Sequence, residues 1–431
     1  MTIEQERARR YAERLLGLHT EGEWHQRLEP KMGSAAPKIR NSARMTDRAI
    51  NRRWEILGSG EEVRSELLDA RSNEQRERYR RNIENFVGTV KVPVGLAGPL
   101  RVNGLFAQGD YYIPLATSEA ALVASYSRGA QVISAAGGCS AMLLNEGLTR
   151  APGFIFRNLQ ECGRFLVWVT GQMQAFRQCV EGTTRHGRLI DMRITVEGNH
   201  VYLIFEYLTG DASGQNIATF ATQAIHDYIL SHSPIRPHRS YVEANLSGDK
   251  KASAQSYLFV RGKKVTAEVI LPSSLVESQL RTDPRAIVEC WGMGAIGGVL
   301  TGTIGVQGHF ANGLAALYLA CGQDVACVAE SAVGVSRFEV TPEGALYGCV
   351  TLPNLMVGTI GGGTNLPSQR ACLELLGLSG EGHAHALAEV AAGLCLAGEL
   401  SITAAMATGT FSKAHRTLAR GKRSPRIMGF A

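Results

Sequence analysis

The chain has 431 residues, of which 45% are apolar and 19% charged, and its formal net charge is +6. This length predicts two or three structural units, and the composition is that of a globular protein with a large core. The basic residues gather near the two ends without interleaved aromatic residues or zinc-finger and homeodomain patterns, so a nucleic-acid partner is not expected.

The cysteine pattern argues against a disulfide framework or a zinc site, because the nine cysteines include no CxxC pair. We therefore expect no metal. The segment from Glu4 to Arg10 is charged and does not look like a signal peptide. No stretch approaches the roughly 20 apolar residues of a membrane span. These features predict a reduced, cytoplasmic protein without a membrane partner.

Short amphipathic helices with exposed charge are expected from residue 4 to about residue 81. Residues 84–104 are rich in Gly, Pro and β-branched side chains, which predicts short strands and turns. An apolar helix is expected from Glu119 to Ser134.

A different unit is predicted between about residues 149 and 241. Two strands meet at Glu197-Gly198-Asn199, and a helix follows them. The resulting β–α–β–β–α order is typical of a small ferredoxin-like domain inserted into a larger one. A further strand pair is expected at 256–260 and 263–271. After residue 285, segments rich in Ala, Gly and Leu predict closely packed helices.

Two glycine motifs suggest nucleotide binding but lack its usual context. The GxGxxG motif at 292–297 has its next acidic residue, Asp324, nearer thirty than twenty positions away, so a Rossmann site is not expected. We expect a Gly-rich helix at a packing interface instead. The run Gly361–Gly363 has no P-loop lysine, so a turn or the close approach of a ligand is the expected reason for it.

Charged residues within small, apolar surroundings are the first candidates for chemistry. Glu119, Lys250 and Asp324 each lie in such a segment. Burial of a charge costs free energy unless the charge is paired or functional. A structural ion pair or a helix N-cap remains an alternative for each of them, and His415 could be an ordinary polar helix residue.

The same positions fall within longer motifs. Between about Glu84 and about Arg420, the segments PVGLAGPL, TSEAALVAS, DASGQN, GDKK, ACGQD, GTIGGGTNLPSQ and LAGELSITAAMATGTFSKAH occur in this order. Together they resemble the successive signatures of the 3-hydroxy-3-methylglutaryl-CoA (HMG-CoA) reductase family.

The resemblance implies an α+β fold with a helical N-terminal part, a large domain around a long central helix and an inserted small ferredoxin-like domain. It also implies a homodimer or higher homo-oligomer with active sites at the subunit interface. The expected division is a helical part at 1–84, a large catalytic and substrate domain at 85–143 and 253–431, a small NADPH-binding domain at 144–240, and a connecting loop at 241–252 with the catalytic lysine.

The family's catalytic residues match Glu119, Lys250, Asp324 and His415. Reduction of a thioester to an alcohol needs two hydrides, and a lysine ammonium can stabilise the first oxyanion, which is the role implied for Lys250. His415 would protonate the departing thiolate, and Glu119 would supply the proton for the second reduction. Asp324 would lie next to Lys250 and Glu119 and raise the proton affinity of Glu119.

NADPH is the cofactor that the resemblance implies. The loop that matches the family's nicotinamide site contains Asp211, Ser213, Gly214, Gln215 and Asn216, with Ser213 and Gln215 in place of two methionines. Thr184, Arg185 and His186 match the segment that holds the 2′-phosphate, for which a hydroxyl group and a guanidinium are suitable.

The acyl-binding positions depart from the family. Met142 replaces an arginine, Met293 a lysine and Glu243 a serine. The substrate-binding set implied by the resemblance is Glu84, Arg128, Met142, Glu243, Asp249, Lys251 and Asn312.

These departures leave three interpretations open. The chain reduces HMG-CoA to mevalonate, or it reduces another thioester without the HMG carboxylate, carried by CoA or by a carrier protein. Alternatively, it binds acyl thioesters without catalysis.

Overall fold

The computed structural model describes residues 3–17, 20–33, 36–40 and 42–411. The chain divides into two compact units, Met1–Asp69 with Ile83–Gly88, and Ala70–Asn82 with Thr89–Ala431. Helices and strands are both abundant, so the structure confirms the predicted α+β class.

The first unit is helical, as expected. Its helices are α1 (Ile3–Leu16), α2 (Glu21–Leu28), α3 (Asp47–Leu57) and α4 (Glu61–Leu67). Arg53 on α3 is buried and donates hydrogen bonds to the carbonyl groups of Phe86 at 2.8 Å, Arg44 at 3.0 Å and Ser42 at 3.1 Å. This side chain therefore fastens both the segment before α3 and the segment 83–88 to the helix.

The second unit is built on one large, mostly antiparallel sheet. Its strands are β1 (Val94–Gly104), β2 (Gln108–Ala116), β3 (Cys139–Arg150), β4 (Gly153–Ile155), β5 (Arg188–Glu197), β6 (His200–Leu208), β7 (Arg239–Tyr241), β8 (Gly262–Leu271), β9 (Gly305–Val306), β10 (Gly334–Val340) and β11 (Leu346–Leu355). Its helices are α5 (Ala70–Glu74), α6 (Leu122–Ala135), α7 (Leu159–Val169), α8 (Met173–Glu181), α9 (Gln215–His232), α10 (Ser273–Leu275), α11 (Pro284–Thr301), α12 (Phe310–Ala320), α13 (Val328–Ser331), α14 (Pro367–Leu375) and α15 (Ala384–Ala407).

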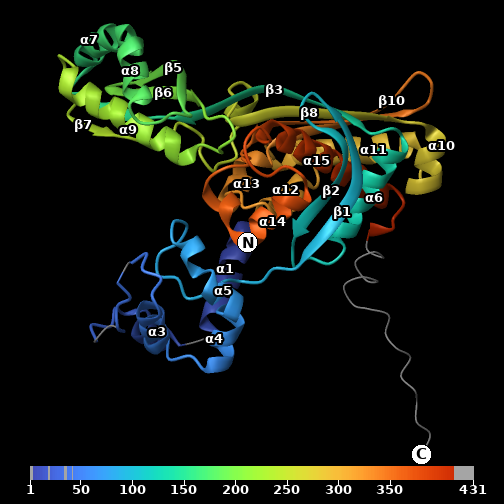
Figure 1. Ribbon diagram of the computed structural model, residues 1–431, viewed down its shortest axis with the longest axis horizontal. Coiled ribbons are helices and arrows are strands. Elements are labelled where there is room, and N and C mark those ends of the chain that lie inside the picture. Colours follow the sequence, from blue (N-terminus) through green and yellow to red (C-terminus); the bar gives the residue numbers. More distant parts are fainter. Residues whose placement is uncertain (1–2, 18–19, 34–35, 41, 412–431) are drawn as a thin grey trace, which may run out of the picture. The chain divides into compact units, whose positions relative to one another are not determined.

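Strand β3 connects two regions of this unit. Its first part pairs with β1 and β8, and its last residues pair with β6. Beyond that point β4, β5, β6 and β7 form an antiparallel sheet in the order β7–β4–β6–β5, accompanied by α7, α8 and α9 (Figure 1). This is the predicted ferredoxin-like arrangement, with its hairpin at Glu197–Asn199.

Helix α15 is the central helix of the remaining region. It packs against α6, α12 and the strands β3, β8 and β11. The close contact with α6 requires glycine, because a Cβ atom at Gly129 would lie 1.9 Å from the carbonyl oxygen of Ala397. Among the described residues only α15 is long and apolar enough to cross a membrane, but 83% of its apolar window is buried inside the fold. It is therefore placed as a core helix.

Two predicted elements were wrong. Residues 256–260 form no strand, because Ser253 caps a 3₁₀ turn at Ala254–Tyr257 and the Asn354 side chain bonds both Ser256 and the backbone of Arg261. Strand β8 pairs with β3 and β11 instead. The helix expected from Glu119 begins only at Leu122, after Ala121 in a left-handed conformation (φ 72°).

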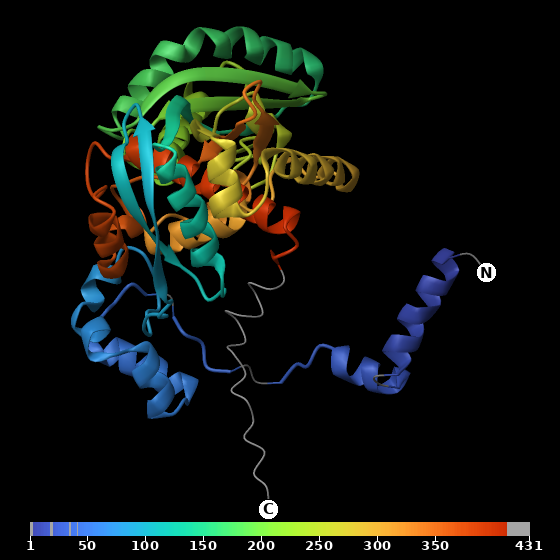
Figure 2. The same cartoon turned by 90° about the vertical axis from the view of Figure 1, so that its right-hand side faces the viewer.

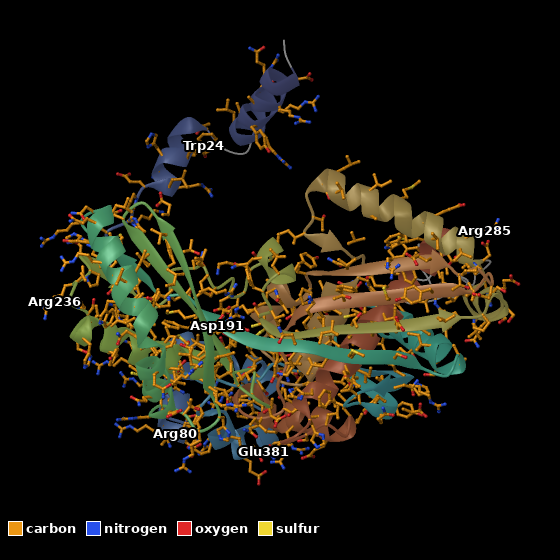
Figure 3. All side chains as sticks on the ribbon, turned by 90° about the horizontal axis from the view of Figure 1, so that it is seen from above. Trp24, Arg80, Asp191, Arg236, Arg285 and Glu381 are labelled. Atoms are coloured by element: carbon orange, nitrogen blue, oxygen red, sulfur yellow. The ribbon has the colours of Figure 1, made fainter. Side chains whose placement is uncertain are left out.

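Helix α11 carries the GxGxxG motif and presents it to open space. No atom lies within 4 Å of a Cβ built at Gly292, Gly294 or Gly297, so the expected packing interface is absent among the described residues. In the second unit α11 projects beside the strands, with Arg285 in its first turn (Figure 2 and Figure 3). Its exposed apolar side chains are Met293 (79%), Ile296 (65%), Val299 (74%) and Leu300 (82%).

Candidate active site

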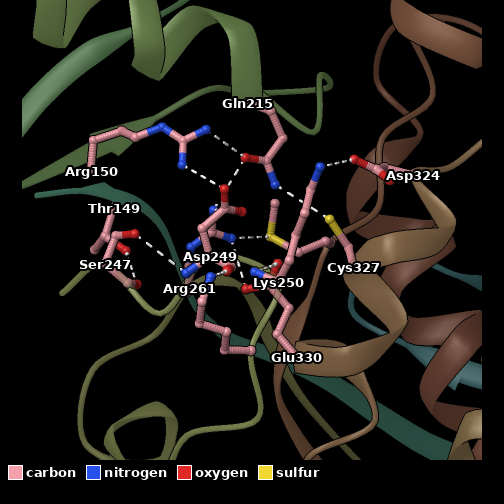
Figure 4. A network of polar contacts seen from close by, with 12 residues as sticks. Thr149, Arg150, Gln215, Ser247, Asp249, Lys250, Arg261, Asp324, Cys327 and Glu330 are labelled. Carbon is pink, nitrogen blue, oxygen red and sulfur yellow. Dashed lines mark hydrogen bonds and ion pairs between the residues drawn. The ribbon is translucent and has the colours of Figure 1, made fainter. Parts of the chain in front are cut away.

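Lys250 and Asp324 form an ion pair with 2.9 Å between Nζ and Oδ2 (Figure 4). Both side chains keep about 40% of their surface accessible, at 41% and 40%. The small, apolar sequence surroundings of these two charges predict that they are buried, which is wrong for the single chain. The hydrogen bond that the Lys250 ammonium donates to Asp324 raises the pKa of Lys250, so the ammonium form is favoured.

The backbone at Lys250 is left-handed, with φ 57°, a conformation that disfavours residues other than glycine. Its N–H donates to Oε1 of Glu330 at 3.2 Å. The turn also contains Gly248 with φ 75°. The lysine therefore lies on a tight loop whose conformation depends on a contact outside the loop.

A network of charged side chains lies beneath this loop (Figure 4). Asp249 accepts hydrogen bonds from Arg261 at 2.6 Å and from Arg150 at 2.8 Å. Burial opposes ionisation of Asp249, but the two guanidinium groups outweigh it and hold its pKa below the usual value. Arg261 also bonds Glu330 at 2.8 Å, and Oε1 of Gln215 accepts from both arginines at 3.1 Å.

Glycines bring the Asp324 turn close to the Gly361–Gly363 run. Gly322 has φ 68°. A Cβ atom at Gly363 would lie 2.5 Å from the carbonyl oxygen of Gly322. Asp324 accepts a hydrogen bond from the N–H of Ala326 and so caps the following 3₁₀ turn, Val325–Cys327. Of the two expected reasons for the triple glycine, a turn with close backbone contact is what the structure shows.

The loop predicted to hold the nicotinamide is tied to the same region. The Asp211 carboxylate accepts hydrogen bonds from the N–H groups of Gly382 and Ala384, before and at the start of α15. Gly214 has φ 79° and precedes the first residue of α9, Gln215. The Gln215 side chain lies in the network, where it also donates to Sγ of Cys327 at 3.4 Å. The loop from Asp211 to Asn216 is thus adjacent to the network that supports Lys250.

The predicted phosphate-binding residues lie on a turn between α8 and β5. The hydroxyl oxygen of Thr184 accepts hydrogen bonds from the N–H groups of His186 and Gly187, at 3.1 and 3.3 Å. Arg185 and His186 are exposed. The turn therefore displays a guanidinium and an imidazole to solvent.

Glu119, Arg128 and Asn312 line a separate cavity of about 510 Å³. Arg128 donates to the hydroxyl and carbonyl oxygens of Ser401. Glu119 is exposed, contrary to the burial assumed from its sequence surroundings. Among the described residues no hydrogen bond or ion pair joins the Glu119 carboxylate to Lys250 or Asp324.

Sequence reasoning missed His309, which lines the same cavity. It is only 7% exposed, stacks on Tyr126 and bonds Asn312 through Nδ1 at 3.1 Å, while Nε2 is buried without a hydrogen-bond partner. Burial lowers its pKa to about 4, so the imidazole is neutral at neutral pH. Its position three residues before Asn312 was the available signal.

The predicted acyl-binding residues are dispersed. Met142 on β3 is 46% exposed, and Lys251 donates to the carbonyl oxygen of Asp249. Glu243 accepts hydrogen bonds from the N–H groups of Ala151 and Asn245. It also lies 3.7 Å from Arg150.

Two further predicted residues are not in the described part of the second unit. Glu84 belongs to the first unit, where it is exposed, and His415 lies outside the described residues.

Comparisons with known proteins decide the family. The family model for hydroxymethylglutaryl-coenzyme A reductase matches residues 49–420. The chain belongs to this family. It is 41% identical to the 3-hydroxy-3-methylglutaryl-coenzyme A reductase of Methanothermobacter thermautotrophicus over 377 residues, which cover 87% of this chain and 94% of that protein. The Aeropyrum pernix reductase is 41% identical over 404 residues, covering 92% and 93%.

Solved structures agree on the fold of this oxidoreductase. The class II reductase of Streptococcus pneumoniae, bound to NADPH in open conformations, aligns with a TM-score of 0.62 and 20% identity. The alignment covers 83% of this chain and 96% of that one. This likeness shows the fold, while the family model and the archaeal relatives confirm the family predicted from the sequence motifs.

Proposed function

We propose that this chain reduces HMG-CoA to mevalonate with NADPH. The observation that carries the proposal is the accessible Lys250–Asp324 ion pair at 2.9 Å, adjoining the loop from Asp211 to Asn216. The overall reaction consumes two hydrides and two protons and releases CoA as the thiol.

Lys250 donates a hydrogen bond to the thioester oxygen and stabilises the negative charge that develops there. Asp324 keeps the lysine protonated, since its hydrogen bond raises the pKa of Lys250. Glu119 delivers the proton that completes the second reduction, and His415, outside the described residues, protonates the thiolate.

The residues present fit NADPH. The exposed Arg185 guanidinium beside Thr184 suits the 2′-phosphate, and the start of the 18-residue helix α9 favours phosphate groups. When bound, NADPH supplies the hydride for each reduction. The segment from Asp211 to Asn216 would hold the nicotinamide, next to the network that supports Lys250. The domain division expected from the sequence is part of this proposal, with residues 144–240 as the cofactor-binding domain.

A second copy of the chain completes each site. Glu119 and Asn312 line a cavity that does not include Lys250 or Asp324, so in a single chain the proposed acid and the proposed oxyanion ligand are apart. The exposed apolar side chains on α11 would be buried in a homodimer. The dimer is proposed to be cytoplasmic.

A second substrate class is favoured by Met142. This thioether is 46% exposed where the family resemblance leads one to expect an arginine, and it offers no charge to a carboxylate. Glu243 offers no positive charge either. It is an acid, and it already accepts hydrogen bonds from two backbone N–H groups. A thioester that lacks the terminal carboxylate, carried by CoA or by a carrier protein, fits these residues.

The deciding experiment measures NADPH consumption with HMG-CoA and with acetyl-CoA, using wild type, Glu119→Gln and Glu343→Gln. Glu343 is an exposed carboxylate on the β10–β11 turn and serves as the control. The proposal is supported if wild type and Glu343→Gln turn over HMG-CoA and Glu119→Gln does not. Turnover of acetyl-CoA alone would assign the second substrate class. NADPH binding without turnover of any thioester would support the non-catalytic alternative.

A further inference from the structure

Glu330 is a fully buried carboxylate, 0% exposed, next to the proposed catalytic lysine. One oxygen, Oε1, accepts the N–H of Lys250 at 3.2 Å. The other, Oε2, accepts Nη1 of Arg261 at 2.8 Å. Burial of a carboxylate is unfavourable unless it is paired and hydrogen-bonded, and both conditions are met here.

The short segment 324–330 contacts both the side-chain ammonium and the backbone N–H of Lys250. Asp324 opens the segment and bonds the ammonium, while Glu330 lies on α13 and bonds the backbone N–H (Figure 4). The 3₁₀ turn Val325–Cys327 between them is capped by Asp324 itself. The two anchoring points of the lysine are therefore held at a fixed separation.

A lysine needs such support more than most residues. Its long side chain loses much rotamer entropy when it is fixed, and here the left-handed backbone (φ 57°) adds a conformational cost. The adjacent loop residue, Asp249, is held by Arg261, which also bonds Glu330. Glu330 thus restrains the loop both directly and through Arg261.

We propose that Glu330 is a positioning residue for Lys250, which fixes the ammonium by holding the lysine backbone and the Arg261–Asp249 pair. This inference rests on the proposed function, in which Lys250 stabilises the oxyanion. A purely structural role, neutralising Arg261, is already filled in part by Asp249 at 2.6 Å. That role does not account for the hydrogen bond that the Lys250 N–H donates to Glu330.

The first test is Glu330→Gln. The amide is isosteric and can still accept the Lys250 N–H, but it presents either an uncharged oxygen or an N–H group to Arg261. We expect kcat to fall by roughly 10²-fold, the scale on which a misplacement of about 1 Å affects catalysis, with KM for NADPH unchanged. Glu330→Asp keeps the charge but retracts the carboxylate by one methylene, so a smaller loss of kcat is expected.

The second readout does not depend on turnover. Reductive methylation with ¹³C-formaldehyde, with the signal assigned through Lys250→Arg, reports the Lys250 titration by NMR. The charged and titratable groups around Lys250 are Asp324, Asp249, Cys327, Glu330 and Arg261. If the ammonium is released from Asp324 in Glu330→Gln, the Lys250 pKa falls toward its usual value.

Ile229→Ala is the control for lost stability alone. Ile229 is 0% exposed on α9 and takes no part in the network, so its truncation lowers stability without moving kcat or the Lys250 titration. Unchanged kcat and Lys250 titration in folded Glu330→Gln overturn the inference. If that variant does not fold, unchanged values in Glu330→Asp do the same. Absence of HMG-CoA turnover in wild type would instead refute the proposed function, while the titration still tests the positioning role.

Discussion

The Lys250 ammonium lies 2.9 Å from the Asp324 carboxylate, and the backbone N–H of the same lysine lies 3.2 Å from Glu330. Two residues of the segment 324–330 therefore determine the position of this lysine, and one of them, Asp324, raises its pKa. The pair is accessible to solvent, so a substrate can reach the ammonium directly.

Replacing Asp324 by Asn should move the basic limb of the kcat–pH profile to lower pH. Asp324 is the principal cause of the raised Lys250 pKa, so the ammonium persists to higher pH in wild type than in the variant. The measurement is kcat from pH 6 to pH 10 at saturating NADPH. Asp110→Asn, which breaks the exposed pair with Arg101, is the control and should leave the profile unchanged. The same basic limb in wild type and Asp324→Asn would contradict the role of this pair.

Mixing two inactive variants should restore activity if the site is shared between subunits. In a hybrid dimer of Glu119→Gln and Lys250→Met, one site carries both changes and the other carries none. Random exchange then restores about a quarter of the wild-type activity, because about half of the dimers are hybrids. The measurement is turnover after co-refolding of the two variants.

The same mixture distinguishes the opposite arrangement. If Glu119 and Lys250 of one chain acted together, every site in the hybrid would carry one change, and no activity would return. Co-refolding Lys250→Met with Asp324→Asn, whose positions pair within one chain, should stay near the level of the separate variants.

The sequence predicted local structure well where a single motif is sufficient. The turn at Glu197–Asn199 and the helix that became α9 are examples, since side-chain periodicity and turn residues specify them within a few positions. The segment 256–260 has the composition of a strand, but the Ser253 hydroxyl accepts a hydrogen bond from the Gln255 N–H and the Asn354 amide donates one to Ser256, which holds the segment in a turn. A long-range contact such as that of Asn354 leaves no local periodicity.

The candidate site shows the same limit. Family motifs pointed to Lys250 and Asp324, which the structure places in contact. Arg150, Gln215 and Arg261 come from different elements, and no local sequence spacing indicates that they converge beneath Lys250. Glu330 lies on the short helix α13, and its sequence position alone does not indicate that it is buried.

Arg185→Ala should lower the preference for NADPH over NADH. A hydrogen bond to a charged group contributes about 1.5–3 kcal/mol, so KM for NADPH should rise roughly 10-fold or more while KM for NADH changes little. Steady-state kinetics with both cofactors measure this ratio. Arg177→Ala removes another exposed arginine, on α8, and should leave the ratio of the two KM values unchanged. An equal rise in KM for NADPH and for NADH in Arg185→Ala would mean that the 2′-phosphate binds elsewhere.

Arg261→Met should be strongly destabilising, since it removes one partner of a buried ion pair. Arg261 and Glu330 are 3% and 0% exposed, and breaking such a pair typically costs about 3–5 kcal/mol. Urea unfolding monitored by circular dichroism measures the loss. Arg101→Met breaks an exposed pair and should change stability little.

The loss in Arg261→Met should shrink as the pH falls. Burial raises the pKa of Glu330 above its usual value of 4.5, while Arg261 opposes this effect. Removing Arg261 raises that pKa further, so the folded variant takes up a proton more readily than the unfolded chain does. For a carboxyl group shifted in this direction, stability is highest below the unfolded pKa and decreases as the pH rises toward the folded one. The difference between wild type and variant should therefore be smaller near pH 5 than at pH 8. A difference independent of pH would mean that Glu330 is not the group left without its partner.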